Sequence, residues 1–165
     1  MSRVYSLKTI QTVPADIHKV WDFFSDPANL KDITPPSLSF KVTGKHAGDM
    51  IYPGQVIEYK VSPILGIPLY WMTEITHVTD KKLFVDEQRY GPYNLWHHQH
   101  HFKEDRDGIV MTDIVHYKIP FWFVGDMANA LFVRKQLRGI FEFRHQVVQR
   151  LFGCLEPEKC NIEFY

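Results

Sequence analysis

The feature that most constrains the fold is a long succession of short β-type runs followed by one long helical segment. Between Ser37 and Lys118 the runs mix β-branched and aromatic residues with polar ones, and Gly, Pro and Asp turn signals divide them. We expect strands near 38–44, 54–62, 68–78, 82–90, 93–103 and 108–118. Consecutive strands with short connections pair antiparallel, so this part of the chain is predicted to form a meander.

A helical pattern replaces the β-type runs after Pro120. From about Asp126 to Phe152 the chain has no proline and one glycine, which favours one long helix. One face of this helix carries Leu131, Arg134, Leu137, Phe141, Arg144 and Val148.

The first third of the chain predicts one strand and two short helices. Residues 4–13 are predicted to form the strand, and Pro14 is expected at the start of the first helix. Ser25-Asp26-Pro27 combines a cap with a first-turn proline, so it begins a second helix that runs to about Ile33.

These elements predict an α+β fold, with a curved antiparallel sheet of six to seven strands around a long C-terminal helix. A chain of 165 residues is long enough for one domain with a sizeable core, so residues 1–165 are expected to be a single domain. Because one long helix covers so many strands, the concave face of the sheet is either filled by side chains or encloses a cavity.

Charge and hydropathy exclude several classes of protein. The chain has 19 Lys and Arg against 19 Asp and Glu and no basic tract, so a nucleic-acid partner is not expected. No segment approaches the roughly 20 apolar residues of a membrane span, and the N-terminus lacks the apolar core of a signal peptide. We therefore expect a cytoplasmic protein with no stable membrane insertion. Cys154 and Cys160 are expected to be ordinary thiols.

Histidine is concentrated in one predicted strand. The segment Trp96–Phe102 holds four of the nine histidines. Strand alternation puts His98 and His100 on the face of the bulky apolar ends, and His97 and His101 on the opposite face. The first face is predicted to point into the cavity and the second toward solvent.

Two imidazoles two residues apart on a strand could bind a metal, with Asp113 or Glu87 from a neighbouring strand as a further ligand. The alternative is that His98 and His100 are neutral, hydrogen-bond to carboxylates or tyrosine hydroxyls, and fix the wall of the pocket. A His-x-His pattern alone is a weak metal signal, so we favour the second interpretation and expect no metal and no cofactor.

The last predicted strand should place a carboxylate inside the molecule. Alternation puts Asp113 on the inner face together with Met111, Val115 and Tyr117. A carboxylate that is buried alone is costly, so Asp113 needs a cationic or donor partner. The candidates are Arg134 on the long helix, which could instead hold an anionic head group of a ligand, and His98 or His100 across the sheet.

The register of the 82–103 hairpin decides which acidic side chain faces inward. A two-residue loop at Gly91-Pro92 puts Glu87 opposite Trp96 and Val85 opposite His98, with Glu87 inside. A shift of one residue puts Asp86 and Gln88 inside instead. We choose the first register.

The rest of the predicted lining is mainly apolar. Tyr59 and Thr73 carry hydroxyls that could orient an oxygen of a ligand. The loops 44–54 and 63–68 have enough glycine and proline to shape an entrance. The full predicted lining is Phe24, Ile57, Tyr59, Val61, Trp71, Thr73, Ile75, Val85, Glu87, Trp96, His98, His100, Met111, Asp113, Val115, Tyr117, Leu131, Arg134, Leu137 and Phe141.

With these features the sequence resembles the ligand-binding SRPBCC domains of the START-like helix-grip superfamily. The residues that carry the resemblance are Val13-Pro14-Ala15, 20–27, Asn29-Leu30, 33–36, 84–88, Gly91-Pro92-Tyr93, Trp96, His98, His100, Phe102, Thr112-Asp113, Val115, Tyr117 and 132–134. This superfamily also holds birch-pollen-type allergens, polyketide cyclases and coenzyme Q chaperones. The chain looks most similar to an uncharacterised bacterial subfamily, and the resemblance implies a helix-grip fold and a hydrophobic ligand site without an established reaction.

Three functions stay open on the sequence alone. The favoured hypothesis is a binding module that holds a hydrophobic or aromatic small molecule in the cavity. The second is a cofactor-independent enzyme of cyclase, aromatase or dehydratase type with His98, His100 and Asp113 as acid and base. The third is a protein-interaction domain whose core is filled. Phe121-Trp122-Phe123 could form a homodimer contact or simply lead into the last helix.

Overall fold

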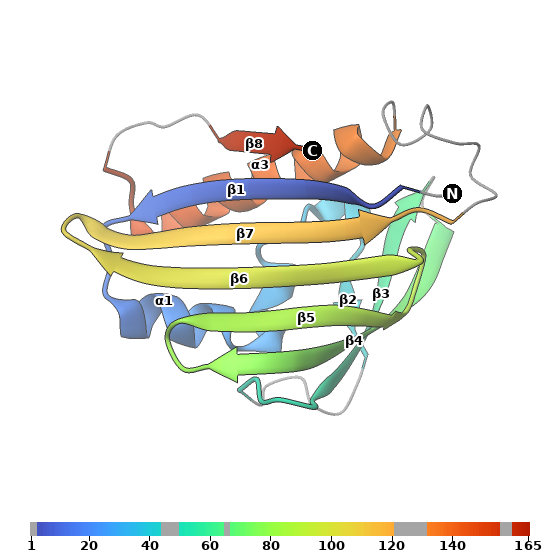
Figure 1. Ribbon diagram of the computed structural model, residues 1–165, viewed down its shortest axis with the longest axis horizontal. Coiled ribbons are helices and arrows are strands. Elements are labelled where there is room, and N and C mark those ends of the chain that lie inside the picture. Colours follow the sequence, from blue (N-terminus) through green and yellow to red (C-terminus); the bar gives the residue numbers. More distant parts are fainter. Residues whose placement is uncertain (1–2, 44–49, 65–66, 121–131, 156–159) are drawn as a thin grey trace.

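The structure, a computed structural model, describes residues 3–43, 50–64, 67–120, 132–155 and 160–165 (Figure 1). Its strands are β1 (Tyr5–Val13), β2 (Lys41–Val42), β3 (Val56–Ile64), β4 (Ile67–Thr79), β5 (Leu83–Tyr90), β6 (Leu95–Asp105), β7 (Gly108–Lys118) and β8 (Asn161–Phe164). Its helices are α1 (Ile17–Phe24), the short 3-10 helices η1 (Pro27–Lys31) and η2 (Pro36–Leu38), and α3 (Arg134–Phe152).

The strands form one antiparallel sheet of eight, in the order β2-β3-β4-β5-β6-β7-β1-β8. The predicted meander is confirmed, since β2 to β7 are neighbours in chain order. The register of β4 against β5 shifts between Ile75 and His77, and such irregularities increase the local bend and twist of a sheet. The sheet therefore curves around its concave face.

The predicted fold class is confirmed: the molecule has a helix-grip fold in which α3 lies against the concave face (Figure 1). The helices lie behind the sheet in this view, with α1 beneath β6 and α3 behind β1 and β7. The predicted inner face of the long helix is largely buried, with Leu137, Phe141, Arg144 and Val148 all covered.

Four details differ from the sequence expectations. The strand expected near 38–44 is reduced to the two residues of β2, and Leu38 belongs to the 3-10 helix η2. The strand β8 was not predicted; it pairs antiparallel with β1 and buries Ile162. The first helix begins at Ile17 because Asp16 is its N-cap and accepts a hydrogen bond from the His18 amide at 2.8 Å. The second helix is a short 3-10 turn that begins at Pro27, not an α-helix that reaches Ile33.

The buried side chains form three clusters. Cluster 1 joins α1 to β6, β7 and the second half of α3, and includes Trp21, Phe24, Phe102 and Met111. Cluster 2 joins the first half of α3 to β1, β7 and β8, and includes Tyr5, Leu7, Val115, Tyr117 and Leu137. Cluster 3 lies on β3 and β4, with Ile57, Tyr59 and Ile75. The clusters leave space between them on the concave face, as described below.

Among the described residues, no helix is both long enough and apolar enough to cross a membrane.

Candidate functional site

A cavity of about 180 Å³ lies between the concave face of the sheet, α3 and the segment from α1 to η2. Residues of all three clusters line it, including Phe24, Phe141 and Ile57. The third hypothesis from the sequence, a domain whose core is filled, therefore does not fit the structure.

Twelve of the predicted lining residues do line the cavity. They are Phe24, Ile57, Tyr59, Val61, Trp71, Thr73, Ile75, Trp96, His98, His100, Leu137 and Phe141. Alternation along the strands and the helical period predicted these positions correctly, because each belongs to an element with one clearly apolar face.

Other predicted lining residues lie elsewhere. Met111 packs in cluster 1, and Val115 and Tyr117 pack in cluster 2 against Leu137 and Phe141, so α3 separates this part of β7 from the cavity. Leu131, the segment 121–123 and part of both predicted entrance loops lie outside the described residues.

The predicted register of the β5–β6 hairpin is wrong by one residue. Asp86 pairs with His98, and Glu87 pairs with His97. The connection is longer than two residues, and the Gln88 side chain holds it by donating to the Tyr93 carbonyl at 2.6 Å. The alternative that the sequence left open for Asp86 is therefore the observed one.

The register shift moves two predicted lining residues to the outer face of the sheet. Glu87 accepts from Arg89 Nη1 at 3.2 Å and lies 2.9 Å from His97 Nδ1. Val85 pairs with Gln99 and is buried there, outside the cavity lining. Asp86 and Phe84 take their places inside.

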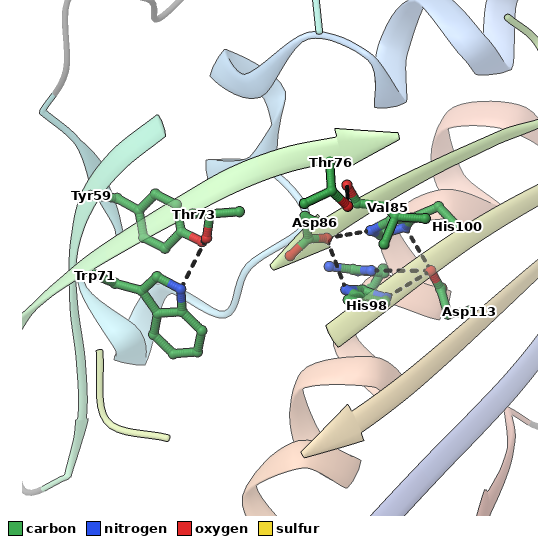
Figure 2. Close-up of polar contacts among 10 residues, drawn as sticks. Tyr59, Trp71, Thr73, Thr76, Val85, Asp86, His98, His100 and Asp113 are labelled. Carbon is green, nitrogen blue, oxygen red and sulfur yellow. Dashed lines mark hydrogen bonds and ion pairs between the residues drawn. The ribbon is translucent and has the colours of Figure 1, made fainter. Parts of the chain in front are cut away.

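Two histidines and two aspartates form a closed network beside the cavity (Figure 2). Asp86 Oδ2 lies 3.0 Å from His100 Nε2 and 3.4 Å from His98 Nδ1. Asp113 Oδ1 lies 2.8 Å from His100 Nδ1 and 3.1 Å from His98 Nε2. Asp113 is buried behind the two rings and does not itself line the cavity. Each imidazole thus lies between the same two carboxylates, and we call these four residues the His–Asp network.

The contacts and the burial of the two histidines together favour a different charge on each. Both ring nitrogens of His100 lie within 3.0 Å of carboxylate oxygens, closer than those of His98, and carboxylates only accept, so we assign His100 two N–H groups and a positive charge. Burial lowers the pKa of His100, but the bonds to Asp113 and Asp86 more than offset it, and the net shift is upward. Burial and the charge of His100 lower the pKa of His98 to about 4, so His98 is neutral at pH 7.

The two carboxylates stay ionised for the complementary reason. Burial acts to raise their pKa values, but the facing histidines outweigh it. The pKa of Asp113 is held well below its ordinary value by the hydrogen bond and charge of His100, and the pKa of Asp86 is also lowered.

Arg144, not Arg134, is the arginine close to Asp113. The Arg144 Nη1 atom lies 3.7 Å from Asp113 Oδ1, and Arg144 also lines the cavity. The guanidinium of Arg134 lies over the rings of Tyr5 and Phe164 at 5.9 and 5.4 Å. Of the candidate partners of Asp113 that the sequence offered, the structure therefore shows His98 and His100 and not Arg134. The helical pattern placed Arg134 and Arg144 on the same face of the helix. Their positions along the axis of α3 decide which of them reaches Asp113.

A wall of aromatic rings lines the cavity on the side of β3 and β4. The Tyr59 ring lies 4.9 Å from Phe40 and 5.9 Å from Trp71, and Trp71 contacts Tyr93 and Trp96 edge to face. Phe40 and Tyr93 were not predicted to line the cavity. They fall within the predicted strands 38–44 and 93–103, but the structure places each just before the observed strand, β2 or β6, so strand alternation does not set their direction.

A metal ion could be held by one part of the His–Asp network. One ligand atom each from Asp86, His98 and His100 lie within 4.8 Å of one another. In the structure, however, both ring nitrogens of His100 face carboxylate oxygens at 3.0 and 2.8 Å, a setting that favours two N–H groups, whereas a metal requires a nitrogen lone pair. The donor set as arranged therefore fits an ion-pair network better than a metal centre.

The fold and the cavity define a class of protein: helix-grip proteins with an internal pocket between a curved sheet and a long C-terminal helix. Residues 13–143 match the family described as polyketide cyclase / dehydrase and lipid transport. The chain belongs to this family. No curated protein matches it in sequence.

Solved structures share the fold at low sequence identity. Protein Ms6760 from Mycobacterium smegmatis is 19% identical with a TM-score of 0.64, over 88% of this chain and 89% of that one. TTHA0849 from Thermus thermophilus is 15% identical with a TM-score of 0.64, over 89% and 96%. The major latex-like protein 151 of Panax ginseng is 13% identical with a TM-score of 0.65, over 90% and 97%. At these identities the likeness concerns the fold alone.

Proposed function

We propose that the protein binds a hydrophobic or aromatic small molecule in the cavity between the sheet and α3. The observation that carries this proposal is the cavity itself, about 180 Å³ in volume and lined mainly by aliphatic and aromatic side chains. An apolar cavity of about 150 Å³ is large enough to hold benzene, so this one suits a small ring or a short chain. The family description, which names lipid transport and polyketide chemistry, supports the same proposal.

The test is native mass spectrometry of the freshly purified protein. We expect a mass increase from a bound apolar molecule, which solvent extraction then releases for identification. A protein that carries no ligand, and that takes up none from a panel of small aromatic and acyl compounds, would contradict the proposal. Bound zinc would instead assign Asp86, His98 and His100 to a metal centre.

A second candidate function is a cofactor-independent enzyme of the cyclase, aromatase or dehydratase type. The observation that favours it is that His98 lines the cavity and lies 3.1 Å from Asp113, while burial lowers the pKa of His98 to about 4. A neutral imidazole oriented by a carboxylate could move a proton on a bound ketone or enol. His100, already protonated, would orient Asp113.

The two functions differ in what His98→Ala changes. An enzyme would lose pH-dependent turnover of a polyketide-type substrate while ligand affinity survives; Asp113→Asn should do the same. The absence of turnover by the wild-type protein across a polyketide panel would leave only the binding function.

We also propose that residues 1–165 act as one domain, that the protein is cytoplasmic, and that it has no nucleic-acid partner. The equal numbers of acidic and basic residues support the last statement. We also propose a homodimer with Phe121-Trp122-Phe123 at its contact. Its molecular mass in solution is measured for the wild type and for a variant in which these three residues are serines, and the variant should be monomeric.

A further inference from the structure

One end of the cavity holds a small hydrogen-bonded group from β3 and β4. Tyr59 and Thr73 hydrogen-bond to each other through their hydroxyls, and Trp71 Nε1 donates to Thr73 Oγ1 at 3.0 Å. All three side chains line the cavity, and Figure 2 shows them converging at a distance from the His–Asp network. We call Tyr59 and Thr73 the hydroxyl pair.

The hydroxyl pair and the Trp71 indole together have one hydrogen-bond donor more than their hydrogen bonds use. The indole N–H, the phenol O–H and the threonine O–H supply three hydrogens, whereas the group makes two hydrogen bonds. Whichever hydroxyl donates within the pair, the hydrogen of the other has no acceptor among the described residues. Tyr59 is 8% exposed and Thr73 is 3% exposed, so bulk water does not readily satisfy this donor. A buried donor without an acceptor is unfavourable, so an oxygen atom of a ligand gains a hydrogen bond here, as it would at Arg144 Nε and Nη1, which are also buried without a hydrogen-bond partner in the part of the chain that the structure describes.

The charges around the cavity favour an uncharged acceptor. Burial raises the pKa of the Tyr59 phenol, and the negative charge of Asp86 adds to this shift. The same charge disfavours a carboxylate next to the hydroxyl pair. The charges on the His–Asp network and Arg144 also balance, because Asp86 and Asp113 face one charged histidine and one arginine. An anionic ligand near Arg144 would compete with Asp113, which lies 3.7 Å from Arg144 Nη1, and would leave the cavity with a net negative charge.

The surroundings of the hydroxyl pair favour a flat apolar molecule. Phe40, Tyr59 and Trp71 present neighbouring rings, and Trp96 contacts Trp71 edge to face at 5.4 Å. Aromatic rings in such offset and edge arrangements attract a further ring. The cavity volume of about 180 Å³ limits the ligand to roughly the size of one substituted ring.

We propose that the hydroxyl pair of Tyr59 and Thr73 is a binding site for a neutral carbonyl oxygen, and that it selects small apolar or aromatic ketones over hydrocarbons and carboxylates of the same size. The proposal rests on the proposed function, since it assigns the chemical class of a ligand held in the same cavity. The hydroxyl pair acts here as a specificity-determining group.

The experiment uses three probes of similar size: ethylbenzene, acetophenone and benzoate. The ratio of the dissociation constants of ethylbenzene and acetophenone is measured by calorimetry for the wild type and for Tyr59→Phe/Thr73→Val. Comparing the ratio between the two proteins cancels the different solubilities of the probes in water. We expect the double variant to lower the preference for acetophenone by about five- to tenfold, the loss of one hydrogen bond. The matched control is Thr12→Val, which removes a threonine hydroxyl from β1 outside the cavity lining and should leave the ratio unchanged.

A measurement on the wild type alone keeps the proposal testable if the double variant fails to fold. The infrared C=O stretch of bound acetophenone should lie below its frequency in hexane, because a donated hydrogen bond weakens the carbonyl bond. At pH 7 benzoate should bind at least about tenfold more weakly than acetophenone, because its carboxylate loses water and adds a net negative charge to a cavity whose charges already balance.

The outcomes separate this inference from the proposed function. Unchanged selectivity in the double variant, a carbonyl frequency equal to that in hexane, or tighter binding of benzoate would each overturn the carbonyl site while cavity binding stands. Failure of all three probes to bind would count against cavity binding itself.

Discussion

Asp86 and Glu87 are neighbours in β5, yet they face opposite sides of the sheet and should respond differently to the loss of charge. Asp86 lies between two buried histidines, whereas Glu87 makes partly exposed ion pairs with His97 and Arg89. We predict that Asp86→Asn lowers the free energy of unfolding at pH 7 by about 3 kcal/mol, because it leaves His100 charged and poorly paired. Glu87→Gln should cost less than about 1 kcal/mol.

Urea unfolding of both variants measures this difference. Equal losses, or a larger loss for Glu87→Gln, would show that the register that places Asp86 inside is wrong.

His98 makes the stability of the protein depend on pH in a defined direction. Its pKa is lowered from 6.5 to about 4, first by burial and then by the charge of His100. A group with a depressed pKa stabilises the folded state above its unfolded pKa, and this contribution is lost as the pH falls toward the folded value. The facing groups are Asp86 and Asp113, which oppose the shift, and Arg144 from α3.

We therefore predict that the free energy of unfolding decreases as the pH is lowered from 6.5 to 4.5. In His98→Gln this decrease should be smaller. The window lies above the ordinary pKa of aspartate, so the loss of the carboxylate charges contributes little there. Chemical unfolding at several pH values measures the slope, and NMR titration of the His98 ring gives its pKa directly. An equal slope in the variant would mean that other histidines cause the dependence.

At the scale of elements, replacing glycine by alanine should have opposite effects on stability at two positions. Gly108 at the start of β7 has φ of +131°, and a Cβ atom there would lie 2.1 Å from the Val13 carbonyl oxygen. Gly139 lies within α3, where a Cβ atom would meet nothing within 4 Å. We predict that Gly108→Ala destabilises the protein by about 2 kcal/mol or more, and that Gly139→Ala stabilises it by up to about 1 kcal/mol.

Thermal and urea unfolding of the two variants check this prediction. A neutral effect of Gly108→Ala would mean that β1 does not approach the β6–β7 turn as closely as the structure shows.

The elements also show which information the sequence contains. Alternation and turn residues placed β3 to β7 within two residues of their ends, because long strands with one apolar face repeat the same signal many times. The four residues of β8 are too few for such a signal, and their pairing with β1 depends on chain segments about 150 residues apart. The register of β5 depended on a hairpin loop whose length the sequence did not define, so the inward position of Asp86 could be named only as an alternative.

At the scale of the whole molecule, the cavity follows from the mismatch between an eight-stranded curved sheet and the one long helix that covers it. Residues of the three buried clusters line the cavity, among them Ile57 and Ile75 of cluster 3 on β3 and β4. An apolar residue that faces a cavity can be replaced by a larger one without displacing its neighbours, whereas a larger side chain in a filled core is destabilising. A larger side chain at such a position therefore separates binding from folding.

We predict that Ile57→Phe weakens the binding of acetophenone more than tenfold and changes the free energy of unfolding by less than about 1 kcal/mol, because the added ring occupies space that a ligand needs. The control is Ile10→Phe, the same substitution at a β1 residue that is 47% exposed and lies outside the cavity lining. It should leave binding unchanged. Calorimetry with the probe and urea unfolding measure the two effects separately. Wild-type affinity in Ile57→Phe would place the ligand elsewhere on the molecule, whereas a large loss of stability would show that the space beside Ile57 is already filled by its neighbours.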